Sequence, residues 1–219
     1  YGAASVVGKA VGWVRVPRSM SSYGMDNGPF IDDQDNDGYP DSWRLLPDAV
    51  SLLAKDVNVA AYQHIVVLHA GFGQESSRQP RDIWSVSYIR WRVDTIQGSF
   101  DQFAVVPEYE AQGFETLGVY THEFGHLLGL PDLYSYTQEQ VGLWDLMARG
   151  AWNGNPPGSS PAEMIAWDRM FLGWITSDRI LDITKPVKVN ATLNPIESSS
   201  PGLRAIRVQT SSQDSKHYY

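Results

Sequence analysis

The pattern of hydrophobic and polar residues predicts strands followed by a helix in the first two thirds of the chain. Residues 64–71 (HIVVLHAG) form an apolar run that ends at glycine, as a buried strand does. Residues 83–93 (IWSVSYIRWRV) alternate between apolar and polar side chains, and residues 103–109 (FAVVPEY) are mostly apolar, so both are predicted as strands. Residues 114–128 carry apolar side chains at three- and four-residue steps, and Gly129 supplies a helix stop. This order of elements predicts an α+β fold.

A second helix is predicted from its start signals. Ser160 precedes Pro161, and Glu163 stands three residues after the serine, which matches a capping box with proline at the first helical position. The apolar residues of MIAWDRMFLGW (164–174) continue the pattern. We therefore expect a helix that begins at Pro161.

The periodicity changes beyond residue 180. Residues 187–193 (VKVNATL) and 203–210 (LRAIRVQT) alternate with period two and predict a hairpin-like pair of strands. We expect one domain over residues 1–180 and the start of a small β-rich module over residues 181–219. Because the chain stops within another strand-like stretch, KHYY, we expect this module to be truncated.

Composition limits the partners and the chemistry. Eight tryptophans, eleven tyrosines and 42% hydrophobic residues argue against a disordered chain. The formal net charge of −8 and the lack of a basic run argue against nucleic acid and anionic membranes as partners. No apolar run approaches the roughly 20 residues that span a bilayer. The chain has no cysteine, so any bound metal must be held by histidine, carboxylate or carbonyl groups.

An HExxH pattern lies on the predicted helix. His122 and His126 are four residues apart, so their imidazoles project from one face and can bind the same zinc ion. Glu123 lies beside that face, where a carboxylate can take a proton from a zinc-activated water and pass it to a leaving amine. The pattern also fits two surface histidines on an ordinary amphipathic helix.

The residues after the helix strengthen the zinc interpretation. Gly129 allows a sharp turn, after which Asp132 could return to the metal as a third ligand. Asp132 could instead cap the end of the helical segment or hydrogen-bond to a ligand. Met147 follows downstream in a turn rich in glycine and tryptophan, GLWDLMARG (142–150).

A long zinc motif followed by a methionine turn resembles the metzincin zinc proteases. Aspartate in place of a third histidine resembles one branch, the immune inhibitor A-like family of secreted bacterial and archaeal metalloproteases. The resemblance covers roughly residues 32–175. Its segments, in chain order, are HAGFGQES (69–76), IWS (83–85), GVYTHEFGHLLGLPDLY (118–134), GLWDLMARGAWNG (142–154) and SPAEMIAWDRMFLGW (160–174).

The resemblance implies a metzincin-like catalytic domain with a mixed β-sheet and an active-site helix, followed by a small β segment. It further implies an extracellular or cell-surface zinc endopeptidase that acts on proteins or peptides. His122, His126 and Asp132 would bind zinc, Glu123 would be general base and acid, and Met147 would pack beneath the metal. An association with a missing C-terminal portion is left open.

Two other functions remain possible at this point. One is a catalytically idle binding or surface-layer module that keeps the metal site as architecture, although the intact Glu123 argues against it. The other is a zinc hydrolase that acts on bonds other than peptide bonds. Tyr134 and Tyr136 are candidates to stabilise an oxyanion, as tyrosines do in some metzincins, but their spacing does not decide this.

The acidic stretch DQDNDGYPD (33–41) has the alternation of a calcium loop, with Gly38 at its sixth position. The standard glutamate at position 12 is missing, because Arg44 stands there, and Glu75 or Asp32 could complete the shell. A solvated acidic turn is the alternative, but closely spaced carboxylates repel each other without a cation. The predicted calcium ligands are Asp33, Asp35, Asp37, the Tyr39 carbonyl and Asp41.

Overall fold

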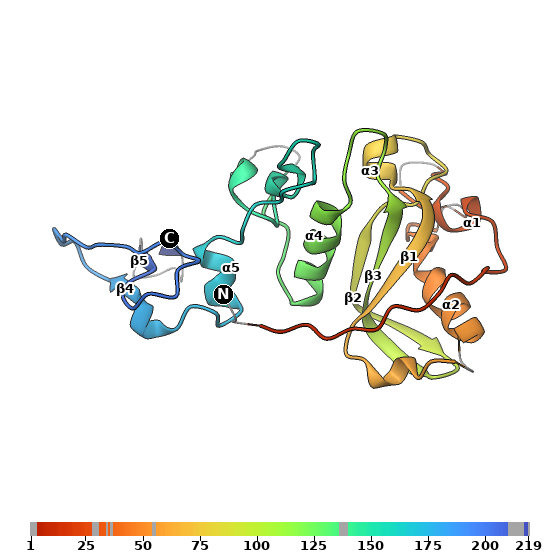
Figure 1. Ribbon diagram of the computed structural model, residues 1–219, viewed down its shortest axis with the longest axis horizontal. Helices are drawn as coiled ribbons and strands as arrows, with labels where there is room; N and C mark the ends of the chain where they lie inside the picture. Colours follow the sequence, from red (N-terminus) through yellow and green to blue (C-terminus); the bar gives the residue numbers. More distant parts are fainter. Residues whose placement is uncertain are drawn as a thin grey trace. The chain divides into compact units, whose positions relative to one another are not determined.

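The computed structural model describes residues 4–27, 31–33, 35, 37–53, 56–135, 140–209, 217 and 218. The chain forms two compact units, one of Ala10–Ala162 and one of Tyr1–Lys9 with Glu163–Tyr219. The predicted α+β class is confirmed (Figure 1). A domain boundary near residue 180 stays a prediction. Within the described ranges, no helix has the length and apolar character needed to cross a membrane.

A three-stranded sheet is the centre of the larger unit. Its order is β1 (Ile65–Phe72), β3 (Gly98–Tyr109) and β2 (Val86–Thr95), with β1 parallel and β2 antiparallel to β3. All three strands coincide with predicted ones. β3 begins five residues before the predicted start because Thr95 pairs with Gly98 across a two-residue turn. The φ of +128° at Gly98 suits glycine at this hairpin.

Helices lie on both sides of this sheet (Figure 1). On one side, α2 (Leu45–Leu53) contributes Leu45, Leu46 and Val50 to the hydrophobic core, which also contains Tyr88 and Phe103 of the sheet. On the other side, α4 (Leu117–Leu127) packs against β2 and β3. Residues 103–107 are therefore buried on both faces, which explains their continuous apolar run.

The end of α4 sets the direction of the chain that follows it. Gly129 has a φ of +100°, its N–H donates to the His126 carbonyl at 2.8 Å, and the N–H of Leu130 donates to the Gly125 carbonyl at 3.1 Å. These two bonds form a Schellman motif, in which glycine adopts the left-handed conformation at low cost. The predicted helix stop is confirmed, and the chain turns back toward the helix.

The described residues of the smaller unit include an α-helix and a second sheet. The helix is α5 (Ala166–Phe171), and the sheet has the order β4 (Ile180–Ile183), β5 (Ala205–Gln209) and β6 (His217–Tyr218). The remaining helical turns of both units are α1 (Ser21–Gly24), α3 (Gln74–Ser77) and the 3₁₀ turns Asp41–Arg44, Val59–Ala61, Gly142–Trp144, Arg149–Trp152 and Ser177–Arg179.

Two predictions in this region are wrong. The helix begins at Ala166 rather than Pro161, and its N-cap residue, Ile165, makes no side-chain cap bond. The carboxylate of Glu163 instead forms an ion pair with Arg169 at 2.6 Å, so it cannot complete a capping box. Residues 187–193 form no strand, because the two edges of β5 are already paired with β4 and β6.

Candidate metal centre

The two histidines of α4 are oriented by backbone carbonyls. His122 Nδ1 lies 2.9 Å from the Leu146 carbonyl, and His126 Nδ1 lies 2.8 Å from the Leu130 carbonyl. A carbonyl oxygen can only accept a hydrogen bond, so each Nδ1 carries a proton, and in the neutral imidazole each Nε2 keeps its lone pair. A metal-binding histidine is commonly held in this way. Both Nε2 atoms are thus prepared to act as ligands.

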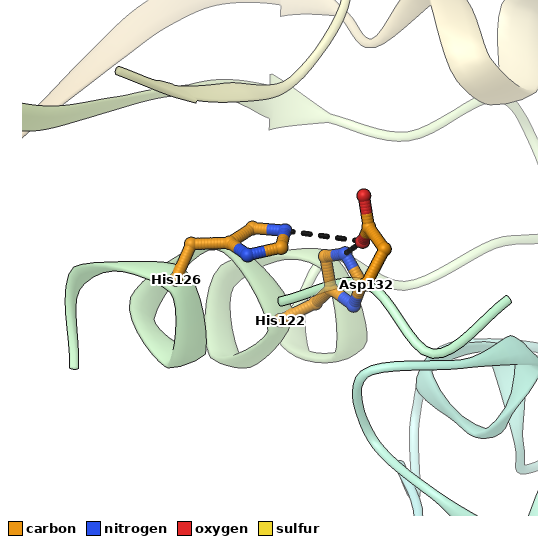
Figure 2. Close-up of side chains that lie close together, drawn as sticks. All are labelled: His122, His126 and Asp132. Carbon is orange, nitrogen blue, oxygen red and sulfur yellow. Dashed lines mark ion pairs between the residues drawn. The ribbon is translucent and has the colours of Figure 1, made fainter. Parts of the chain in front are cut away.

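Asp132 lies against both histidines. Its Oδ1 is 3.2 Å from His122 Nε2 and 3.2 Å from His126 Nε2 (Figure 2). The Schellman turn brings the chain back, and the N–H of Leu133 donates to the Met147 carbonyl at 2.8 Å, which holds the segment in place. Asp132 does not cap the end of the helix, because the free groups at a helix C-terminus are carbonyls, to which a carboxylate cannot donate a hydrogen bond.

The three donors fit a zinc ion. Two donors at 2.0–2.1 Å from a tetrahedral ion lie about 3.3 Å apart, close to the 3.2 Å between Asp132 Oδ1 and each Nε2. The histidine side chains are 12% and 16% exposed, and that of Asp132 is 42% exposed. Two nitrogens and one oxygen with an open side match a catalytic site, in which the fourth position is left for water or substrate.

The charges at this point are strongly coupled. Burial disfavours the charged form of Asp132, but hydrogen bonds from the protonated forms of His122 and His126 outweigh this and hold the pKa of Asp132 well below its ordinary value. Burial also opposes protonation of both histidines, yet Asp132 and Glu123 raise the pKa of each imidazole. Positive charge is therefore favoured where the three side chains meet, and a bound cation would supply it.

Glu123 is buried next to the histidines, with 6% of its surface exposed. Its Oε2 accepts a hydrogen bond from Ser87 Oγ of β2 at 2.8 Å. Burial raises the pKa of Glu123, and the two neighbouring imidazoles and Ser87 partly oppose that rise. The spacing of the motif predicted Glu123, but no signal in the sequence indicated Ser87.

Met147 packs against the helix that carries the histidines. It is fully buried, and a Cβ atom added at Gly125 would collide with its Sδ. The turn around it is held by Asp145, whose Oδ1 accepts the N–H of Met147 at 2.6 Å. This turn also supplies the carbonyls that hold His122 and Leu133. The methionine turn thus supports both the helix and the segment that carries Asp132.

Of the two tyrosines considered for an oxyanion role, one is placed near the histidines. The ring of Tyr134 lies 6.2 Å from that of His122, with an angle of 30° between them. Tyr136 lies outside the described residues.

Three carboxylates of the acidic loop lie close together. Asp33, Asp35 and Asp37 each offer an oxygen within 4.8 Å of the other two. Asp33 is fully buried and accepts the N–H groups of Asp37 at 3.0 Å and Gly38 at 2.8 Å, so it shapes the turn.

The other predicted calcium ligands lie differently. Asp41 forms an ion pair with Arg44 and does not belong to the group of three. The side chain of Tyr39 is exposed. Both oxygens of Glu75 bind Ser85, and the carboxylate of Asp32 binds the N–H of Trp84. The structure therefore brings together three of the four predicted aspartates, and Arg44 pairs with Asp41 and also contacts Asp35 at 3.2 Å.

A pair of carboxyl groups near the sheet, of which Glu110 is buried, was not predicted from the sequence. Glu110 is 4% exposed, and its Oε2 accepts a hydrogen bond from Ser76. Burial and the adjacent Glu75 raise the pKa of Glu110 from 4.5 to about 8. With a pKa of about 8, the carboxyl group of Glu110 keeps its proton at neutral pH.

This pair should make stability depend on pH. Because Glu110 releases its proton at about 8 when folded and at about 4.5 when unfolded, its stabilising contribution is complete below pH 4.5 and is lost as the pH rises to about 8. Urea unfolding at pH 5, 6, 7 and 8 should show that the unfolding free energy of Glu110→Gln rises relative to that of the wild type as the pH rises. Glu115→Gln, which removes an exposed carboxylate, is the control. A difference in unfolding free energy between Glu110→Gln and wild type that does not change with pH would contradict the raised pKa of Glu110.

Comparison with known proteins shows the family of the chain. The sequence model described as "Immune inhibitor A peptidase M6, catalytic domain" matches residues 60–177, more than half of the chain. The pre-pro-metalloprotease PrtV of Vibrio cholerae serotype O1 is 29% identical over 207 residues, which cover 77% of this chain and 22% of that protein. Immune inhibitor A of Bacillus thuringiensis subsp. alesti is 28% identical over 213 residues, which cover 78% of this chain and 30% of that protein.

The chain thus spans between a fifth and a third of the length of these relatives. The matched range contains both histidines, Glu123, Asp132 and the methionine turn. The chain belongs to the immune inhibitor A peptidase M6 family of metalloproteases.

Proposed function

We propose that the chain is the catalytic part of a zinc-dependent endopeptidase that hydrolyses peptide bonds in proteins. The observation that carries this proposal is the meeting of His122 Nε2, His126 Nε2 and Asp132 Oδ1, next to a buried glutamate. The family supports metalloprotease chemistry, and the donor set supports zinc.

Each side chain of the site has its own role in the proposed reaction. His122, His126 and Asp132 would hold zinc, whose chemistry in such a site is to acidify water and polarise a carbonyl. Glu123 takes the proton of the attacking water and delivers it to the leaving amine. Its raised pKa suits both steps, because a base whose pKa is nearer neutrality can also return the proton. Met147 supports the helix from beneath.

Casein hydrolysis tests this function. The zinc-loaded chain should release peptides from casein, a chelator should stop the reaction, and added zinc should restore it. Zinc binding without cleavage of casein or of any generic peptide would contradict the proposal. Such a result would favour an idle binding module or a hydrolase of another bond.

We further propose an extracellular or cell-surface location, which rests on the family. Protein substrates are the partners that an endopeptidase requires. Because the relatives are several times longer, association with further protein segments remains a prediction.

We also propose that Asp33, Asp35 and Asp37 bind calcium as a structural ion. Their oxygens lie within 4.8 Å of one another, and oxygen donors on a tight turn suit calcium. Asp33 holds the turn through two N–H groups, whereas Asp37 accepts the N–H of Tyr39 and Asp35 contacts Arg44 at the surface, so Asp35 and Asp37 are the residues to test by mutation.

Calcium should raise the melting temperature of the zinc-loaded protein. At calcium concentrations ~100 times the dissociation constant, the gain is about 2.7 kcal/mol, which for a chain of this size is roughly 5–10 °C. The double variant Asp35→Asn, Asp37→Asn should lose the effect, and magnesium is the control ion. Equal melting temperatures of the wild type with and without calcium would refute a structural ion.

A further inference from the structure

Ser87 of β2 contacts the proposed catalytic base. Its hydroxyl oxygen lies 2.8 Å from Oε2 of Glu123 and 2.9 Å from the backbone carbonyl of the same residue. One hydroxyl thus contacts both the side chain and the backbone of Glu123. The contact joins the sheet to the helix that carries the metal-binding histidines.

The strand places Ser87 on the side of the sheet that faces α4. Side chains alternate along β2, and the next residue, Tyr88, is buried in the core on the opposite side. The register partner of Ser87 is Ala104, another small residue. Two small residues side by side let the helix approach closely enough for a hydroxyl to reach Glu123.

Ser87 is the single hydrogen-bond donor to the Glu123 carboxylate within the described part of the chain. Glu123 is 6% exposed, so water has little access to its carboxylate in place of this donor. Without Ser87, burial would still confine the side chain, but no directed interaction would select its orientation.

We propose that Ser87 is a positioning residue, which fixes the Glu123 carboxylate in the orientation needed to exchange a proton with the attacking water. The inference rests on the proposed function. A catalytic group must be held within about 0.5 Å of its productive position. A misplacement of about 1 Å can cost on the order of 100-fold in rate.

Three variants test this role by steady-state peptide hydrolysis. Ser87→Ala should lower kcat by roughly 10- to 100-fold, with KM within about twofold of wild type and full zinc content, because binding and metal ligation do not involve the hydroxyl. Ser87→Thr retains a hydroxyl on a strand that favours threonine, and it should recover most of kcat.

Ser85→Ala is the matched control. Ser85 lies two residues away and donates its hydroxyl to a different carboxylate, that of Glu75, at 2.5 Å. This variant loses a comparable bond without touching the base. Its thermal stability should fall while its kcat stays near wild type.

A thermal double-mutant cycle supplies a readout that does not depend on activity. If Ser87 acts on Glu123, Ser87→Ala should lower the melting temperature of the wild type more than that of the Glu123→Ala variant. Equal shifts in both backgrounds would overturn the inference.

The kinetic outcomes separate the two proposals. A Ser87→Ala enzyme with kcat within about twofold of wild type would overturn the positioning role and leave the proteolytic function standing. The same holds if Ser85→Ala loses as much kcat as Ser87→Ala. A wild-type chain that binds zinc and cleaves no peptide bond would instead overturn the proposed function itself.

Discussion

Replacement of Glu123 by alanine is expected to leave zinc bound and to reduce peptide hydrolysis by on the order of 100- to 10,000-fold, the usual contribution of general acid–base catalysis. The metal should stay because the three donors that meet are His122, His126 and Asp132, and the histidines are held by backbone carbonyls. The rate should fall because a peptide amine leaves poorly without the proton that Glu123 delivers.

The measurement pairs zinc content per chain with the rate of casein or peptide hydrolysis. Glu123→Gln keeps an oxygen that can accept the hydrogen bond of Ser87 and should be equally inactive, which separates charge from packing. Glu115→Ala, at an exposed site just before α4, should keep the wild-type rate. A Glu123→Ala enzyme with normal hydrolysis would end the proposed mechanism, and one without zinc would assign Glu123 to metal binding.

Asp132→Ala is expected to lower zinc affinity by more than the roughly 10- to 100-fold that loss of a group hydrogen-bonded to a ligand costs. Its Oδ1 lies equally close to both Nε2 atoms, at 3.2 Å, and its low pKa keeps the carboxylate ionised at any pH at which the histidines can bind a metal. Two neutral imidazoles alone would leave the ion with half of a tetrahedral shell and no compensating negative charge.

Competition with a zinc indicator at fixed pH would give this affinity. Asp132→His restores a donor atom and should bind zinc more tightly than Asp132→Ala, whereas Asp132→Asn keeps the shape without the charge. The side chain is 42% exposed, so melting of the metal-free protein should change little and folding should not obscure the result. Unchanged zinc affinity of Asp132→Ala would remove this residue from direct contact with the metal.

Sequence patterns predicted the larger unit better than the smaller one. The strands β1, β2 and β3 and the helix α4 coincide with their patterns, because each has a face or a run that must be buried. In the smaller unit, Glu163 forms an ion pair with Arg169 instead of the predicted helix cap. Both edges of β5 are already paired with other strands, so residues 187–193 have no free edge to pair with. Predictions from local sequence patterns were wrong where a side chain or a strand edge is paired with a residue outside the pattern.

The acidic loop shows the same limit. Alternation predicted Asp33, Asp35 and Asp37 as neighbours, and they are, because their spacing around a tight turn is local. Asp41 was assigned to the same group but lies outside it; Arg44, three residues away, pairs with Asp41 and also contacts Asp35. The proximity of Glu75 to Glu110 could not be predicted, since Glu75 lies on α3 and Glu110 follows β3.

The sequence by itself determined the parts of the site that are local. A four-residue step puts His122 and His126 on one helix face, Gly129 allows the reversal, and the absence of cysteine restricts the donors to nitrogen and oxygen. The structure decided between the alternatives for Asp132 by placing it against both Nε2 atoms, and it alone decided that Leu146 fixes His122 and that Ser87 holds Glu123. The reason is physical: the last two contacts join positions 24 and 36 residues apart, and one of them uses a backbone carbonyl, which every residue has.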